Sequence, residues 1–99
     1  MQRKDSQTMI YELLSNGAQN AISASQVSKM TNLTPREIRH AVEYERLAGF
    51  IILSDNNGYY LPHDDESIAK LEISAWVANR LTTAKTILKT IEKAQSVMR

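Results

Sequence analysis

"LTPREIRHAVEYERLAGFIILSDNNGYYLP" (residues 33–62) decides the fold of this chain. Its first half predicts a helix, because Thr34 and Glu37 have the spacing of a capping box and a proline stands at the first helical position between them. Gly49 should end this helix, since glycine enters the left-handed conformation easily. The second half predicts a β-hairpin around the turn sequence DNNG, with strands over residues 50–54 and 59–61.

Two shorter helices are predicted before this stretch. Apolar spacing predicts the first over about residues 6–15. Ser23, with a glutamine three residues later, resembles another capping box and predicts a helix over about residues 24–31, after a very short strand at residues 21–23. Asn32 should end that helix, because asparagine enters the left-handed region at low cost. The expected inward-facing apolar residues are Met9, Ile10, Leu13, Leu14, Val27 and Met30.

The order of these elements is helix, helix, three-residue turn, helix and hairpin, which indicates a winged helix-turn-helix domain over residues 1–63. Residues 34–42 carry the pattern T/S-x-R-x-[IV]-R-x-A-[VI], followed by a glycine, a strand and the sequence NGYY. In this the chain resembles the small winged-helix proteins of bacteriophages and prophages. The resemblance implies a bacterial or phage-encoded protein with a DNA-binding role in regulation or replication.

A recognition helix presents its N-terminal half to base edges in the major groove. With Ile38 and Val42 facing inward, Arg36 and Arg39 should face outward, where arginine can bind guanine O6 and N7. An ordinary solvated face, with acidic partners three or four residues away, remains the alternative. The candidate DNA-binding residues, on both helices, the turn and the wing, are Ser25, Gln26, Lys29, Thr34, Arg36, Arg39, His40, Glu43, Asn56 and Asn57.

Glu45 departs from the family pattern, because winged helices of this type usually carry an apolar residue at that position. Either the carboxylate of Glu45 pairs with an arginine at the edge of the domain, or the end of this helix packs unusually.

Residues 64–99 predict one long C-terminal helix of about 33 residues, because Asp64 or Asp65 can cap it and no glycine or proline interrupts it. Such a helix is about 50 Å long, too long for the N-terminal domain to cover. Ile68 and Leu71 should pack on that domain, and Trp76 should be a packing anchor in the long-helix region. The remaining apolar residues recur at heptad spacing and favour a coiled-coil homodimer. This apolar stripe consists of Ile73, Val77, Leu81, Ala84, Ile87, Leu88, Ile91 and Met98.

Composition limits the classes of function. The net charge is only +1, and residues 1–63 hold six basic and six acidic residues, so DNA affinity must come from local placement of charge. The absence of cysteine excludes disulfides and thiolate sites, and no metal-binding or phosphate-binding motif is present, so we expect no cofactor, no metal and no enzymatic activity. Lys85, Lys89 and Lys93 form a row that we interpret as a solvated face.

The sequence thus predicts a mainly α protein with a small β-hairpin, made of a winged helix-turn-helix head and a long C-terminal helix. We expect a cytoplasmic protein without a membrane segment, which binds double-stranded DNA as a dimer and regulates transcription. Two alternatives stay open: a protein-interaction module that docks another protein on the long helix, and a replication accessory protein that shares the DNA-binding surface.

Overall fold

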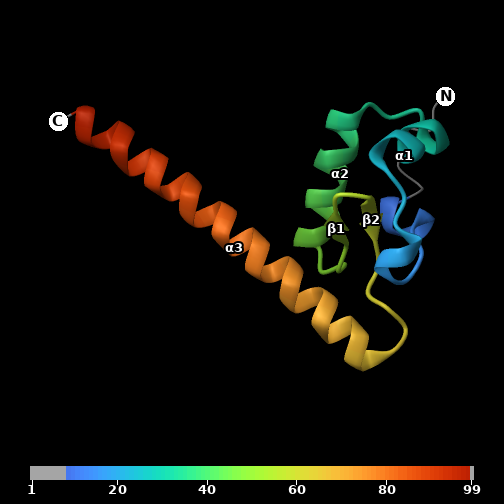
Figure 1. Cartoon of the computed structure of the whole chain (residues 1–99). Coiled ribbons are helices and arrows are strands. Elements are labelled where there is room, and N and C mark those ends of the chain that lie inside the picture. Colours follow the sequence, from blue (N-terminus) through green and yellow to red (C-terminus); the bar gives the residue numbers. More distant parts are fainter. Residues whose placement is uncertain (1–8, 99) are drawn as a thin grey trace.

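The computed structural model describes residues 9–98. These residues are mainly helical with one small antiparallel hairpin, as predicted, and a long helix projects from the rest of the chain (Figure 1). We call residues 9–63 the head. In chain order the elements are the 3-10 helices η1 (Ile10–Leu13) and η2 (Ala18–Asn20), the helices α1 (Ala24–Thr31) and α2 (Pro35–Leu47), the strands β1 (Leu53–Asp55) and β2 (Gly58–Tyr60), and α3 (Glu66–Val97).

Helices α1 and α2 have the boundaries that their capping residues predict. The Ser23 hydroxyl accepts a hydrogen bond from the Gln26 N–H at 3.1 Å, and Asn32, with φ 65°, ends α1 in the left-handed region. The Thr34 hydroxyl accepts from the Glu37 N–H at 3.1 Å, while the Glu37 carboxylate accepts from the Thr34 N–H at 2.9 Å. This reciprocal capping box starts α2 only three residues after α1 ends.

The α-helix predicted over residues 6–15 is wrong in the part that the structure describes; residues 6–8 lie outside that part. A single 3-10 turn, η1, forms instead, and Leu14 already has an extended backbone (φ −95°, ψ 153°). The cause is tertiary hydrogen bonding. The backbone N–H of Leu61 donates to the Ser15 carbonyl at 2.9 Å, so this segment pairs with the chain that follows the hairpin rather than continuing a helix.

The hairpin pairs Leu53 with Tyr60 and is extended on one side by a bridge to Ile22, which is all that forms of the strand expected at residues 21–23. The backbone groups of Ile22 and Tyr59 exchange two hydrogen bonds, at 3.0 and 2.9 Å. Gly58, with φ 136°, makes the turn, and a Cβ there would collide with the Ile22 carbonyl. The first strand begins at Leu53, later than predicted.

The core of the head forms where α1, α2, η1 and the hairpin meet, and its largest fully buried side chains are Ile10, Val27, Ile38, Val42, Ile52 and Leu53. The expected inward position of Met30 is wrong, because that side chain is 55% exposed. Thr31 is buried in its place. Its hydroxyl donates to the Val27 carbonyl at 2.8 Å and accepts from the Leu33 N–H at 3.1 Å, so a polar side chain can stay inside and hold the turn.

Helix α3 begins at the predicted cap, where the Asp65 carboxylate accepts from the N–H groups of Ser67 and Ile68 at 2.9 and 3.2 Å. The expected packing of Ile68 and Leu71 on the head is wrong, since they are 41% and 72% exposed. Although α3 has 32 residues, no helix within residues 9–98 is both long and apolar enough to cross a membrane.

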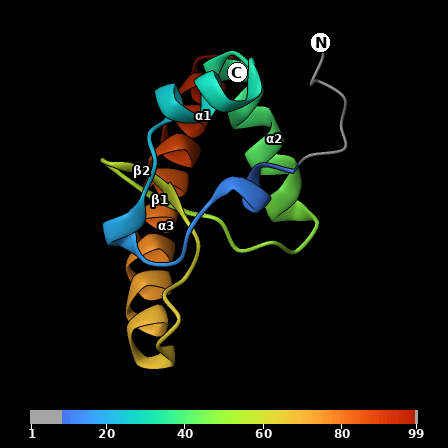
Figure 2. The same ribbon diagram turned by 90° about the vertical axis from the view of Figure 1, so that its right-hand side faces the viewer.

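A different set of side chains joins α3 to the head. The Glu72 carboxylate accepts from the backbone N–H of His63 at 2.8 Å and from that of Ala18 at 3.0 Å. One turn further, Trp76 lies against the end of α2. Arg80, one turn further again, pairs with Glu43 of α2 at 3.2 Å. Beyond Arg80 α3 leaves the head and runs free (Figure 1), and the view turned by 90° has α3 behind the hairpin (Figure 2).

Candidate nucleic-acid interface

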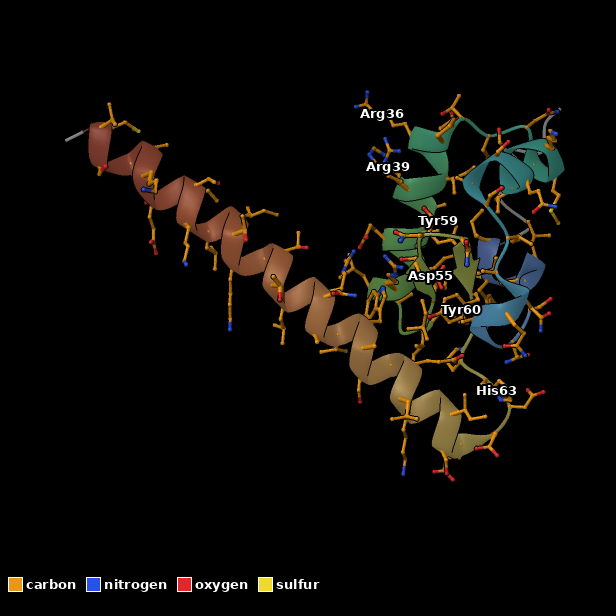
Figure 3. All side chains as sticks on the ribbon, in the orientation of Figure 1. Arg36, Arg39, Asp55, Tyr59, Tyr60 and His63 are labelled. Carbon is orange, nitrogen blue, oxygen red and sulfur yellow. The ribbon has the colours of Figure 1, made fainter. Side chains whose placement is uncertain are left out.

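The outer face of α2 carries the two arginines that the sequence predicts. Because Ile38 and Val42 are buried in the core, Arg36, Arg39 and His40 are exposed. Both arginine side chains point from α2 toward the side on which the free part of α3 runs (Figure 3). Among the residues that the structure describes, neither guanidinium forms a salt bridge. This face of α2 therefore offers two positive groups to an incoming anion.

Glu43, the acid four residues after Arg39, is turned away from it. Its carboxylate pairs with Arg46 at 2.9 Å and with Arg80 of α3 at 3.2 Å. The solvated-face alternative expected acidic partners for the α2 arginines, and the nearest such acid is engaged elsewhere. Glu43 is exposed but already bound twice, so it is a weaker DNA-binding candidate than the sequence suggested.

Arg46 and Arg80 also stack on the indole of Trp76, with guanidinium carbons 4.7 and 5.0 Å from its ring centroid. We call Glu43, Arg46, Trp76 and Arg80 the clamp. Arg46 is inserted deepest, and its Nε donates to the Ile52 carbonyl at 2.8 Å. Burial lowers the pKa of the Arg46 guanidinium, and the neighbouring Glu43 carboxylate opposes this shift. The clamp fixes the direction in which α3 leaves α2.

The clamp as a unit could not be predicted from the sequence. The spacing of Glu43 and Arg46, three residues apart on one helix, could have predicted their ion pair. Nothing in the sequence joins them to Arg80, which lies 37 residues beyond Glu43.

The predicted phosphate-contacting residues lie on α1 and in the turn. Ser25, Gln26 and Lys29 are exposed on α1. Thr34 is exposed too, but its hydroxyl already accepts the capping hydrogen bond from Glu37. Ser28 supports the turn, because its hydroxyl donates to the Leu33 carbonyl at 2.6 Å. The turn is thus held by side chains from both helices.

Asn56 and Asn57 are exposed at the tip of the hairpin, where the Asp55 carboxylate accepts from the Asn57 N–H at 2.8 Å. This tip points away from α2 in Figure 2, so the asparagines and the α2 arginines face different directions. The tip and the start of α1 border a hollow of about 340 Å³.

Glu45 is buried at 3% exposure, and its carboxylate meets no arginine within residues 9–98. It accepts hydrogen bonds from the backbone N–H of Ile10 at 2.7 Å and of Tyr11 at 2.9 Å. Of the two expectations for Glu45, unusual packing of the helix end is therefore the correct one. The carboxylate satisfies the free N–H groups at the start of η1 and joins the N-terminal segment to α2.

The apolar stripe of α3 is uncovered. Only Ile73 is half-buried against the head, whereas Val77, Leu81, Leu88 and Ile91 are 41 to 57% exposed, and Ala84, Ile87 and Met98 are exposed as well. Beside Trp76 the stripe borders a mostly apolar hollow of about 510 Å³. Lys85, Lys89 and Lys93 are exposed.

No protein-family model, no curated protein and no solved structure matches this chain. Within residues 9–98, no group of three or more histidine, aspartate and glutamate side chains is placed to hold a metal ion. Residues 63–66 organise the start of α3, where His63 Nδ1 accepts from the Asp65 N–H at 2.9 Å.

Proposed function

We propose that this chain is a sequence-specific double-stranded DNA-binding protein that acts as a dimer in transcription regulation. Its head would be a winged helix-turn-helix in which α2 is the recognition helix and the hairpin is the wing. One observation carries the proposal: Arg36 and Arg39 are exposed on the N-terminal half of α2 and have no salt-bridge partner among residues 9–98. A helix that follows a tight turn uses this half to reach base edges.

In this proposal the two arginines have the central role. An arginine that enters the major groove donates two parallel hydrogen bonds to O6 and N7 of guanine. His40 is a second reader beside Arg39. Lys29, in the last turn of α1, would contact a phosphate and set the orientation of the head on the duplex.

Charge supports a dimer rather than a single head. With a net charge of +1, the chain has no general attraction for a polyanion, so one head should bind weakly. Two linked heads bind one duplex much more tightly than one head does, because the second contact becomes intramolecular. The exposed stripe of α3 supplies a surface for that association.

Gel-shift titrations of a mixed-sequence duplex pool at two salt concentrations test the proposal. We expect binding at low salt that weakens steeply as salt increases. Arg39→Ala should weaken the selected complex by about 1–3 kcal/mol, or roughly 5- to 150-fold. Lys89→Ala is the matched control, since it removes one positive charge from α3 beyond the head and should have little effect. No binding of any duplex at low salt would contradict the proposal.

A protein-interaction module is the second candidate, and the uncovered apolar stripe favours it. The two candidates predict different effects of substitution. If another protein is the partner, Leu88→Asp should abolish its capture while Arg39→Ala leaves it unchanged. A replication accessory role would use the same DNA-binding surface and share the predictions for Arg39.

A further inference from the structure

Helix α3 has two functional faces about a quarter of a turn apart. One face holds the head through Glu72, Trp76 and Arg80, whose contacts are described above. The other face is the apolar stripe. Val77 directly follows Trp76, so it lies roughly 100° further round the helix, and Leu88 continues the stripe in the same direction. The head therefore covers one side of α3 and leaves the stripe open beside it.

The two flanks of the stripe differ in charge. Lys85 and Glu92, seven residues apart, lie on the flank that faces away from the head. Arg80 and Ile87, also seven residues apart, lie on the flank next to the head. In heptad terms, with Leu88 at position a, the outer flank is position e and the inner flank is position g.

Flank charges oppose a parallel pair of helices. In a parallel coiled coil, position e of one helix faces position g of the other. Lys85 would then face Arg80 of a second copy, and Glu92 would face Ile87 of that copy. The first contact offers Lys85 no acidic partner, because it meets an arginine that already pairs with Glu43 at 3.2 Å, and the second sets a carboxylate against an apolar side chain.

An antiparallel pair places compatible flanks together. Position e then faces position e, so Lys85 lies near Glu92 of the second copy, and this attractive pair occurs twice around the two-fold axis. Position g faces position g, which brings the Ile87 side chains of the two copies into the same apolar contact. Charge complementarity on one flank and apolar contact on the other both favour the antiparallel arrangement.

The position of the heads leads to the same arrangement. In a pair of helices the stripe of each copy faces the other copy, so a head a quarter turn from the stripe projects out of the plane that contains both helices. The two-fold axis of an antiparallel pair is perpendicular to that plane, so both heads lie on the same side of it. In a parallel pair the axis runs along the helices, and the heads lie on opposite sides. Arg36 and Arg39 point toward the side where α3 runs free, so antiparallel heads turn their arginines toward the common axis (Figure 3).

We infer that residues 77–98 of α3 pair with the same residues of a second copy in antiparallel orientation. Met98, 82% exposed in one copy, then covers the apolar hollow beside Trp76 of the other. In this dimer the two recognition helices face the same duplex. The inference rests on the proposed DNA-binding dimer and specifies how its two heads are placed.

Spin-label distances in the full chain test the orientation. The chain has no cysteine, so Thr90→Cys and Ser96→Cys each place one label on α3 outside the stripe. In an antiparallel pair the separation of the two labels along the helix axis should increase from position 90 to position 96 by about 18 Å, which is twice six residues at 1.5 Å each, so the label-to-label distance should be clearly longer at position 96. In a parallel pair both distances should be short and nearly equal.

Charge reversal tests the pairing itself. Lys85→Glu should increase the dimer dissociation constant about tenfold, because it creates two repulsive pairs, and Lys85→Glu with Glu92→Lys should restore it. In a parallel pair Lys85→Glu would instead strengthen the dimer, since the new carboxylate faces Arg80. Lys93→Glu, away from the stripe, is the matched control and should leave the constant unchanged.

The outcomes separate this inference from the proposed function. A monomer at all concentrations, equal distances at the two labels, or capture of a different protein by the stripe would overturn the antiparallel pairing. Each of these can occur while the head still binds DNA through Arg39. Antiparallel distances in a chain that binds no duplex would support the pairing and overturn the proposed function alone.

Discussion

Glu45→Gln should destabilise the protein strongly, although it only replaces one carboxylate oxygen by an amide NH2 group in a side chain far from the proposed DNA-binding face. The Glu45 carboxylate is 3% exposed and accepts two backbone hydrogen bonds, at 2.7 and 2.9 Å. A glutamine amide keeps one acceptor and replaces the other by an N–H donor, which would face the N–H of Ile10 or Tyr11. A buried hydrogen bond to a charged group contributes about 1.5–3 kcal/mol, and an unsatisfied donor adds its own desolvation cost. We therefore expect a loss of about 2–4 kcal/mol.

Urea unfolding followed by circular dichroism measures this loss, with Glu66→Gln as the matched control. Glu66 forms one exposed ion pair with Lys70 at 3.7 Å, so its substitution should cost less than about 0.5 kcal/mol. In thermal unfolding Glu45→Gln should lower Tm by roughly 10–20 °C. If the two variants unfold at the same urea concentration, the buried carboxylate does not join the N-terminal segment to α2.

Four further substitutions have outcomes that follow from local contacts. Gly58→Ala should lower the free energy of unfolding in urea by about 2–4 kcal/mol, because φ is 136° and a Cβ meets the Ile22 carbonyl. Gly49→Ala should lower it by only about 1–2 kcal/mol, because φ is 109° but the space around a Cβ is open. Trp76→Ala should release α3 from the head and speed amide hydrogen exchange in its first turns, while head amides keep their protection. Met30→Ser should change the unfolding free energy by less than about 0.5 kcal/mol, since Met30 is 55% exposed, and a larger loss would place it in the core.

Elements whose signals are local could be predicted from the sequence. The capping box of Thr34 and Glu37, the left-handed Asn32 and the Asp65 cap each use groups within three residues of one another, so their spacing in the sequence is their spacing in space. The same holds for the hairpin, whose turn is made by Gly58. These features determine the mainly helical fold and the position of α2.

Features that depend on distant residues could not be read in this way. The N-terminal segment has helical apolar spacing, yet Leu61 donates to the Ser15 carbonyl and Glu45 accepts from the N–H groups of Ile10 and Tyr11, so only a 3-10 turn forms. The sequence places Glu43 four residues after Arg39 as a possible ion-pair partner, but in the structure the Glu43 carboxylate pairs with Arg80 of α3. Ile68 and Leu71 are apolar yet exposed, and only the direction of α3 decides that Glu72 and Trp76 face the head instead.

In the proposed function, α2 reads DNA sequence through Arg36 and Arg39. Selection of bound duplexes from a random pool, followed by sequencing, measures this reading directly. We expect enrichment of one sequence with two-fold related halves and guanines in each half. Arg36→Ala with Arg39→Ala should abolish that enrichment while the variant keeps the wild-type unfolding free energy. The absence of any enriched sequence with the wild-type chain, or an unchanged sequence with the double variant, would contradict it.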